Sequence, residues 1–179
     1  MTGTRPGRLL LIGMMGAGKT TVGRLLAGRL GWDYSDSDEL VEGSTGRTVA
    51  ELWAASGEAA FRVEETRVLL EALGLPTPAV ISVAGGAVLD PANRELLARS
   101  GPVVWLRADL GTLLARIGDG GGHRPLLAGD PAGVLARLEA ERRPLYQALA
   151  DEIVDVDGLD PGAVADEVLA RLAPSGSRT

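Results

Sequence analysis

A glycine-rich segment near the N-terminus has the residue types and spacing of a phosphate-binding loop. Residues 13–20 read Gly-Met-Met-Gly-Ala-Gly-Lys-Thr and match the pattern G-x-x-x-x-G-K-[ST]. Glycines let the backbone curl so that successive N–H groups point at phosphate oxygens, and a following helix adds the positive end of its dipole. In such loops the lysine contacts the β- and γ-phosphates, and the hydroxyl binds Mg²⁺. We therefore expect Lys19 and Thr20 to serve a nucleoside triphosphate, in preference to a plain glycine-rich turn before a helix.

The basic residues of the chain single out the same lysine. Lysine and arginine together number 18, and Lys19 is the only lysine among them. A lysine ammonium is a compact point charge that suits a phosphate cradle, whereas a guanidinium is broad and planar. The count also argues against a GTPase switch, because the N-K-x-D motif that reads guanine needs a second lysine.

Two carboxylates follow the second predicted strand, in the order Asp36-Ser37-Asp38. This position is the carboxyl end of a strand, where open α/β sheets bind their ligands. We expect Asp36 to lie near Mg²⁺ and Asp38 to orient a substrate hydroxyl and accept its proton. The alternative is an exposed acidic turn that caps the next helix.

Two arginines and a pair of glycines suggest a small acidic substrate. Taken alone, Arg62 and Arg142 would each be an ordinary solvated helix residue. Together, their guanidinium groups could bind one carboxylate through paired hydrogen bonds. Gly85 and Gly86 follow the third predicted strand, where they allow a ligand to approach the backbone or simply form a turn.

A glycine run in the second half of the chain predicts a lid. Residues 118–122 read Gly-Asp-Gly-Gly-Gly, which we expect no regular element to include. Arg124 follows, next to His123, the sole histidine, to which no chemistry is assigned. We expect residues 118–129 to form a mobile lid in which Arg124 neutralises charge on the γ-phosphate in the transition state.

The chain alternates short apolar runs with longer helical patterns, which is typical of βαβ units on a parallel sheet. The predicted strands are residues 9–12, 32–35, 80–84, 103–106 and 153–156. Helix starts are predicted where a capping carboxylate precedes a proline, at Asp90, Asp130 and Asp160, and at the capping box of Thr48 and Glu51. Residues 37–78 are too long for an ordinary crossover, so we expect two or three helices with a binding function.

Composition favours one globular domain. The chain has 179 residues, 45% of them hydrophobic, and a net charge of -6, so no basic field attracts nucleic acid or an anionic membrane. It has no cysteine, which excludes disulfides and thiolate chemistry and suits a reducing compartment. The apolar residues 9–15 imitate a signal peptide, but no apolar run approaches the roughly 20 residues that span a bilayer. We expect a cytoplasmic protein with a disordered tail at 174–179.

In order and spacing these motifs resemble the shikimate kinase family, small P-loop enzymes that transfer the γ-phosphate of ATP to the 3-hydroxyl of shikimate. The resemblance covers nearly the whole chain. The matching pieces are residues 16–21, 36–38, 45–47, 61–62, 85–87, 124–127 and 142–146.

The resemblance implies an α/β fold of the P-loop NTPase type: a three-layer sandwich with a five-stranded parallel sheet and helices on both faces. It implies a single domain over 1–179, with residues 37–73 as a helical substrate-binding subdomain. The partners it implies are shikimate, ATP and Mg²⁺, with no nucleic acid and no membrane, and we expect a monomer.

The resemblance also implies a role for each site residue. Catalysis is expected from Lys19, Asp38 and Arg124, and shikimate binding from Asp38, Arg62, Gly85, Gly86 and Arg142. ATP binding is expected from Gly16, Ala17, Gly18, Lys19, Thr20, Thr21 and Arg124, with Arg116 and Pro161 beside the adenine. Thr20 and Asp36 are the expected Mg²⁺ residues.

Two departures and two alternatives remain. Ala84 stands where the family usually has the first of three glycines, and Leu159 stands where an arginine near adenine is common. One alternative is a P-loop kinase for another small polyol acid or cyclitol, of the gluconate kinase kind. The other is a catalytically silent regulatory relative, against which the presence of the expected catalytic residues argues.

Overall fold

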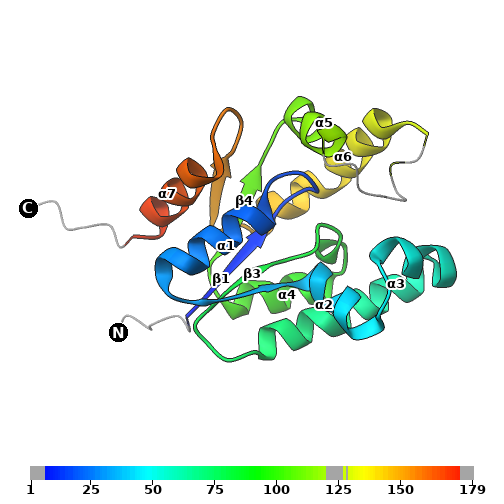
Figure 1. Cartoon of the computed structure of the whole chain (residues 1–179), viewed down its shortest axis with the longest axis horizontal. Coiled ribbons are helices and arrows are strands. Elements are labelled where there is room, and N and C mark those ends of the chain that lie inside the picture. Colours follow the sequence, from blue (N-terminus) through cyan, green and yellow to red (C-terminus); the bar gives the residue numbers. More distant parts are fainter. Residues whose placement is uncertain (1–6, 120–126, 128, 174–179) are drawn as a thin grey trace, which may run out of the picture.

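The computed structural model describes residues 7–119, 127 and 129–173, and within them a single parallel sheet forms the centre of the molecule (Figure 1). Its strands run in the order β2-β3-β1-β4-β5, and every neighbouring pair is parallel. The strands are β1 (Arg8–Ile12), β2 (Asp33–Asp36), β3 (Ala79–Ser82), β4 (Val103–Arg107) and β5 (Glu152–Asp155). The predicted five-stranded parallel sheet is confirmed.

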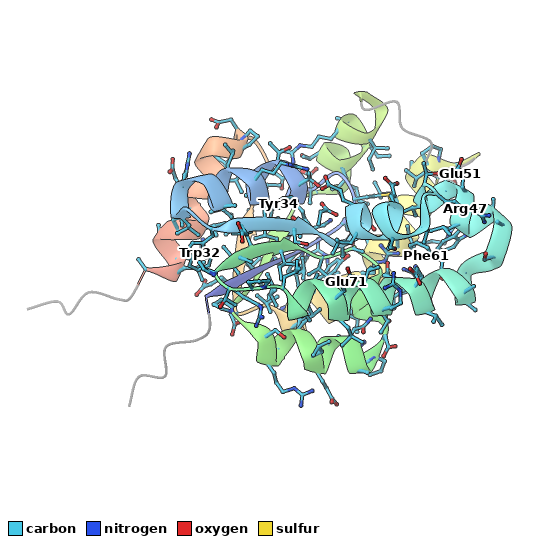
Figure 2. The ribbon with its side chains drawn as sticks, turned by 60° about the horizontal axis from the view of Figure 1, so that its bottom comes forward. Trp32, Tyr34, Arg47, Glu51, Phe61 and Glu71 are labelled. Atoms are coloured by element: carbon cyan, nitrogen blue, oxygen red, sulfur yellow. The ribbon has the colours of Figure 1, made fainter. Side chains whose placement is uncertain are left out.

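Helices cover both faces of this sheet, as expected for three layers. The helices are α1 (Lys19–Leu30), α2 (Ser37–Thr45), α3 (Val49–Gly74), α4 (Pro91–Ser100), α5 (Leu110–Asp119), α6 (Pro131–Leu149) and α7 (Pro161–Leu172), with a short 3₁₀ turn η1 (Ala87–Leu89). Helices α1 and α7 pack together on one face, and Figure 2 shows them on the side of the strands opposite to α4 and the C-terminal part of α3. Among the described residues, every helix is too short or too polar to cross a lipid bilayer.

The central strands are apolar because both of their faces are covered. All four residues of β3 are buried, as are the first four of β4 and the last four of β1. Each fully buried leucine or isoleucine side chain contributes roughly 1.5–3 kcal/mol relative to an exposed one. This rigid centre fixes the loops that follow the carboxyl ends of the strands.

The predicted helix starts are confirmed. The carboxylates of Asp90, Asp130 and Asp160 accept backbone N–H groups of α4, α6 and α7, each with proline at the first turn. Thr48 and Glu51 form the predicted capping box at the start of α3. A capping side chain satisfies a donor that the first helical turn leaves free, which is why such short patterns predict helix starts well.

The long segment between β2 and β3 forms α2 and α3, which pack on each other around a small cluster of Val41, Phe61 and Val68. Helix α3 is kinked at Gly57, whose φ of 76° lies in the region that favours glycine. The segment therefore consists of three helical pieces, within the predicted two or three.

The glycine run differs from the prediction. Helix α5 continues through Gly118 to Asp119, so the expectation that no regular element includes residues 118–122 was wrong for the first two. Burial of Leu113, together with the contact of Ile117 with the loop at Gly16, holds the end of this helix in place despite the weak helix preference of glycine. Residues 120–126 and 128 of the predicted lid, Arg124 included, and the predicted tail lie outside the described residues.

Candidate active site

A cleft of about 900 Å³ opens where the segments that follow β1, β2 and β3 meet α3, α5 and α6. Most of the residues singled out by the sequence line it together. These are Gly16, Gly18, Lys19, Thr20, Thr21, Asp38, Arg62, Gly85, Gly86, Arg116 and Arg142. The cleft therefore brings together a glycine-rich loop, the carboxylate of Asp38 and three arginines that lie far apart in the sequence.

The loop between β1 and α1 has the backbone shape of a phosphate cradle. Gly13, Gly16 and Gly18 have φ values of 147°, 83° and 94°, which side-chain-bearing residues rarely adopt. A Cβ on Gly13 would also lie 2.6 Å from the carbonyl oxygen of Leu106. Glycine is required at these positions, and the loop leads directly into the first turn of α1.

Two cations are braced against this loop. The Nζ of Lys19 donates to the carbonyl oxygens of Gly13 at 2.7 Å and Met14 at 3.0 Å. The Nη1 of Arg116, from α5, donates to the carbonyl oxygens of Gly16 at 3.3 Å and Ala17 at 3.2 Å. Both positive charges therefore lie where phosphate oxygens would meet the loop.

Thr20 and Asp36 form a hydrogen-bonded pair beneath the loop. The Oγ1 of Thr20 donates to Oδ2 of Asp36 at 2.9 Å, and Oδ1 of Asp36 accepts the N–H of Asp38 at 2.9 Å. Asp36 thus also caps α2, as the alternative interpretation of the acidic pair proposed. Oxygen donors of this kind suit Mg²⁺, which usually takes only one or two protein ligands and completes its shell with water and phosphate.

Asp38 is open to the cleft, yet the surrounding protein excludes much of the bulk water. This desolvation, together with the negative charge of Asp36, raises the pKa of the Asp38 carboxyl to about 6, although Lys19 acts in the opposite direction. A carboxylate whose pKa lies near neutrality accepts a proton more readily than an ordinary aspartate.

Glu65 is a site residue that the sequence analysis missed. Arg62 Nη1 donates to both of its carboxylate oxygens, at 2.9 and 3.1 Å, and only 3% of the Glu65 side chain is exposed. Burial raises the pKa of Glu65, while Arg62 and Arg142 oppose that shift. Arg62 and Glu65 are three residues apart on one helix, which makes their side chains neighbours. This spacing is the sequence signal from which the pair could have been predicted.

Arg142 differs from Arg62 because no carboxylate forms an ion pair with it in the described part of the chain. Its residue surface is only 2% exposed, and its Nε has no hydrogen-bond partner. The Tyr146 hydroxyl donates to the carbonyl oxygen of Gly85 at 2.8 Å, and the positive charge of Arg142 acts on this hydroxyl. Glu65 attracts this buried cation, but no described carboxylate lies at ion-pair distance from it, so an anionic ligand in contact with Arg142 would be favourable.

Comparisons with known proteins identify the family. The family model described as Shikimate kinase matches residues 15–173, which is most of the chain. This chain belongs to the shikimate kinase family. The shikimate kinase of Symbiobacterium thermophilum is 46% identical over 172 residues, covering 95% of this chain and 98% of the relative.

Solved structures agree with this membership. A shikimate kinase from Acinetobacter baumannii, in complex with shikimate, superposes with a TM-score of 0.88 at 37% identity, covering 94% of this chain and 93% of that one. A gluconokinase from Sinorhizobium meliloti has a TM-score of 0.54 at 20% identity and shows a shared fold alone. The predicted shikimate kinase resemblance is confirmed, and the gluconate alternative is not favoured.

Three residues predicted for the shikimate kinase site do not line the cleft. Ala17 is 1% exposed and contributes its carbonyl to Arg116, and Asp36 is 8% exposed behind Thr20. Pro161 begins α7 and does not border the cleft, so the structure does not bring it to a common cavity with Arg116. Ser37 was missed by the sequence analysis: its Oγ accepts the N–H of Ala84 at 2.8 Å and ties α2 to the end of β3.

Proposed function

We propose that this chain transfers the γ-phosphate of ATP to the 3-hydroxyl of shikimate and so forms shikimate 3-phosphate and ADP. The observation that carries the proposal is Arg142, a buried cation without a carboxylate partner, in a cleft shared with Arg62 and a phosphate-binding loop. A shikimate carboxylate would supply the missing negative charge, and membership of the shikimate kinase family supports that choice of acid.

Arg62 and Arg142 are proposed to bind the carboxylate, with Gly85 and Gly86 bringing the backbone close to the ring. Glu65 holds Arg62 through two hydrogen bonds, so the guanidinium is fixed before the substrate arrives. Fixing a flexible side chain in advance reduces the entropy lost on binding. We propose residues 37–73 as the substrate-binding subdomain within a single domain.

Asp38 is proposed to accept the proton of the reacting hydroxyl. As that proton moves to the Asp38 carboxylate, the hydroxyl oxygen forms a bond to the γ-phosphorus, and the bond from that phosphorus to the oxygen bridging it to the β-phosphate breaks. The raised pKa of Asp38, about 6, suits a group that must receive a proton at neutral pH.

The loop N–H groups, Gly16, Ala17, Gly18 and Thr21 are proposed to hold the ATP phosphates. Lys19 would leave the carbonyl oxygens of Gly13 and Met14 to follow the γ-phosphate. Thr20 and Asp36 have the oxygen donors and the contact needed to hold Mg²⁺, which when bound neutralises charge on the β- and γ-phosphates.

Further parts of the proposal rest on the family resemblance. The resemblance would place Arg116 and Pro161 beside the adenine, but Arg116 contacts the loop carbonyls of Gly16 and Ala17 and Pro161 lies outside the cleft, so we propose for Arg116 a contact with ATP from α5. Arg124 is proposed to act from the predicted lid over residues 118–129, of which 118 and 119 belong to α5. We further propose that the enzyme works as a monomer in the cytoplasm, which suits a chain without cysteine.

A coupled assay of ADP release tests the proposed function. At fixed ATP and Mg²⁺, release should depend on shikimate and remain near background with gluconate or with an uncharged cyclitol. Release of ADP that is equally fast without shikimate, or faster with gluconate, would overturn the shikimate assignment while leaving the phosphate-binding loop intact.

A further inference from the structure

Tyr34 lies next to the proposed metal residues and was not singled out by the sequence. Figure 2 shows it between β2 and α1. Its hydroxyl donates to Oδ2 of Asp36 at 3.1 Å, the same oxygen that accepts the hydroxyl of Thr20 at 2.9 Å. The two hydroxyl groups therefore meet at one carboxylate oxygen.

Ser82 connects the Tyr34 hydroxyl to the phosphate-binding loop. The Tyr34 hydroxyl lies 2.9 Å from Oγ of Ser82, and that Oγ donates to the carbonyl oxygen of Lys19 at 3.0 Å. The proton of Ser82 is thus already used, so the single Tyr34 proton is shared between Asp36 and Ser82. This chain of bonds joins β2 and β3 to the first turn of α1, where Lys19 and Thr20 lie.

Gly23, in the middle of α1, makes room for this arrangement. A Cβ at this position would lie 2.6 Å from Cε2 of Tyr34 and 2.9 Å from Oγ of Ser82. Glycine weakens a helix interior, so its presence here follows from the need to admit the tyrosine ring. The guanidinium of Arg24 lies over the ring, 4.9 Å from its centroid.

We propose that the Tyr34 hydroxyl is a positioning group for the metal-binding pair of this kinase, holding the Asp36 carboxylate in the orientation that keeps Thr20 directed at Mg²⁺. The inference rests on the proposed metal role of Thr20 and Asp36. The Asp36 carboxylate then accepts hydrogen bonds at both oxygens. The N–H groups of Asp38 and Glu39 bind Oδ1, and the hydroxyls of Thr20 and Tyr34 bind Oδ2. Without the Tyr34 hydroxyl, Oδ2 keeps only the Thr20 hydroxyl as a donor, so the orientation of this oxygen is less well fixed.

The chemistry of Tyr34 suits a hydrogen-bond donor. Its phenol O–H lies within hydrogen-bond distance of two acceptor oxygens, Oδ2 of Asp36 and Oγ of Ser82. Groups that orient metal-binding residues in this way typically change metal affinity 10- to 100-fold when removed. A loss of metal affinity, separate from nucleotide affinity, is therefore the expected signature.

The test is Tyr34→Phe, which keeps the ring and removes the hydroxyl. Binding of Mn²⁺ to the enzyme–ADP complex, followed by the electron paramagnetic resonance signal of free Mn²⁺, should weaken about tenfold. Affinity for ADP without metal should change less than about twofold, and the Mg²⁺ concentration that half-saturates turnover should rise by a similar factor of about ten.

Two further variants separate the possible outcomes. Tyr146→Phe removes the other tyrosine hydroxyl of the chain, which contacts Gly85 and Arg142, and should raise the KM for shikimate without changing Mn²⁺ affinity. Thr20→Val should weaken Mn²⁺ binding strongly. If Tyr34→Phe binds Mn²⁺ as wild type does while Thr20→Val does not, the inference fails and the proposed metal site stands. If Thr20→Val also binds normally, the metal assignment fails and the inference with it.

Discussion

Gly86 and Arg62 fit together only because residue 86 has no side chain. A Cβ on Gly86 would lie 2.0 Å from Nη1 of Arg62, which is far inside contact distance. The same Nη1 is held from its other side by Glu65 at 2.9 Å. The Arg62 guanidinium therefore lies next to both the backbone of Gly86 and the buried carboxylate of Glu65, and its position depends on both.

Gly86→Ala should displace Arg62 and weaken shikimate binding. The φ of Gly86 is -87°, so the alanine backbone is acceptable and the effect comes from the steric contact alone. We expect the KM for shikimate to rise at least about tenfold, which is about 1.4 kcal/mol, with little change in the KM for ATP. Gly28→Ala is a matched control, since nothing lies within 4 Å of a Cβ there, and it should leave both constants unchanged.

Lys19→Met should nearly abolish phosphoryl transfer while the fold survives. The variant loses two hydrogen bonds to the loop, but its main defect is the absence of a positive charge at the γ-phosphate in the transition state. Steady-state turnover and thermal melting measure the two effects separately. Retention of more than about a tenth of kcat, a loss under about 1.4 kcal/mol, would contradict the phosphate-binding role.

Short-range patterns predicted much of this molecule, and long-range contacts account for what was missed. The strands and the caps at Asp90, Asp130 and Asp160 depend on neighbouring residues, so the sequence shows them directly. The roles of Ser37 and Tyr34 depend instead on hydrogen bonds to Ala84 and Ser82, 47 and 48 residues away. No local pattern marks such partners, because they arise only when β2 pairs with β3.

The error at Gly118 has a similar origin. Glycine is a poor helix former, and the run that follows it predicted a break. The structure extends α5 because Leu113 is fully buried and Ile117 lies against Gly16, in a loop about a hundred residues earlier in the chain. Tertiary packing of one apolar face outweighs a local preference of about 1 kcal/mol.

A shikimate analogue with a carboxamide in place of the carboxylate should be a poor substrate. The uncharged amide would leave Arg142 buried with no described carboxylate at ion-pair distance, and such losses typically cost several kcal/mol. We expect kcat/KM to fall at least about a hundredfold with a nearly constant KM for ATP. Arg142→Ala should remove the preference between acid and amide, measured as the ratio of their kcat/KM values. Equal use of both compounds by the wild type would mean that the arginines serve structure alone.

Asp38→Asn should slow turnover and yet stabilise the apo protein at neutral pH. The pKa of the Asp38 carboxyl is raised from 3.8 to about 6 in the folded chain, chiefly by desolvation, so its ionised form opposes folding. That penalty is absent below the unfolded pKa, grows between the two values, and is complete above about pH 6. The gain in Tm over wild type should therefore be largest above pH 6 and shrink toward pH 4.

The exposed Asp33, at the start of β2, provides the matched control for this prediction. Asp33→Asn also removes one carboxylate, but one that does not line the cleft, and it should leave turnover unchanged. Melting curves of both variants and wild type from pH 4 to pH 8 decide the matter. A stability gain for Asp38→Asn that is the same at every pH would show that the desolvated charge of Asp38 is not its cause. Normal turnover by Asp38→Asn would remove this residue as the proton acceptor, because an amide cannot take the proton of the reacting hydroxyl.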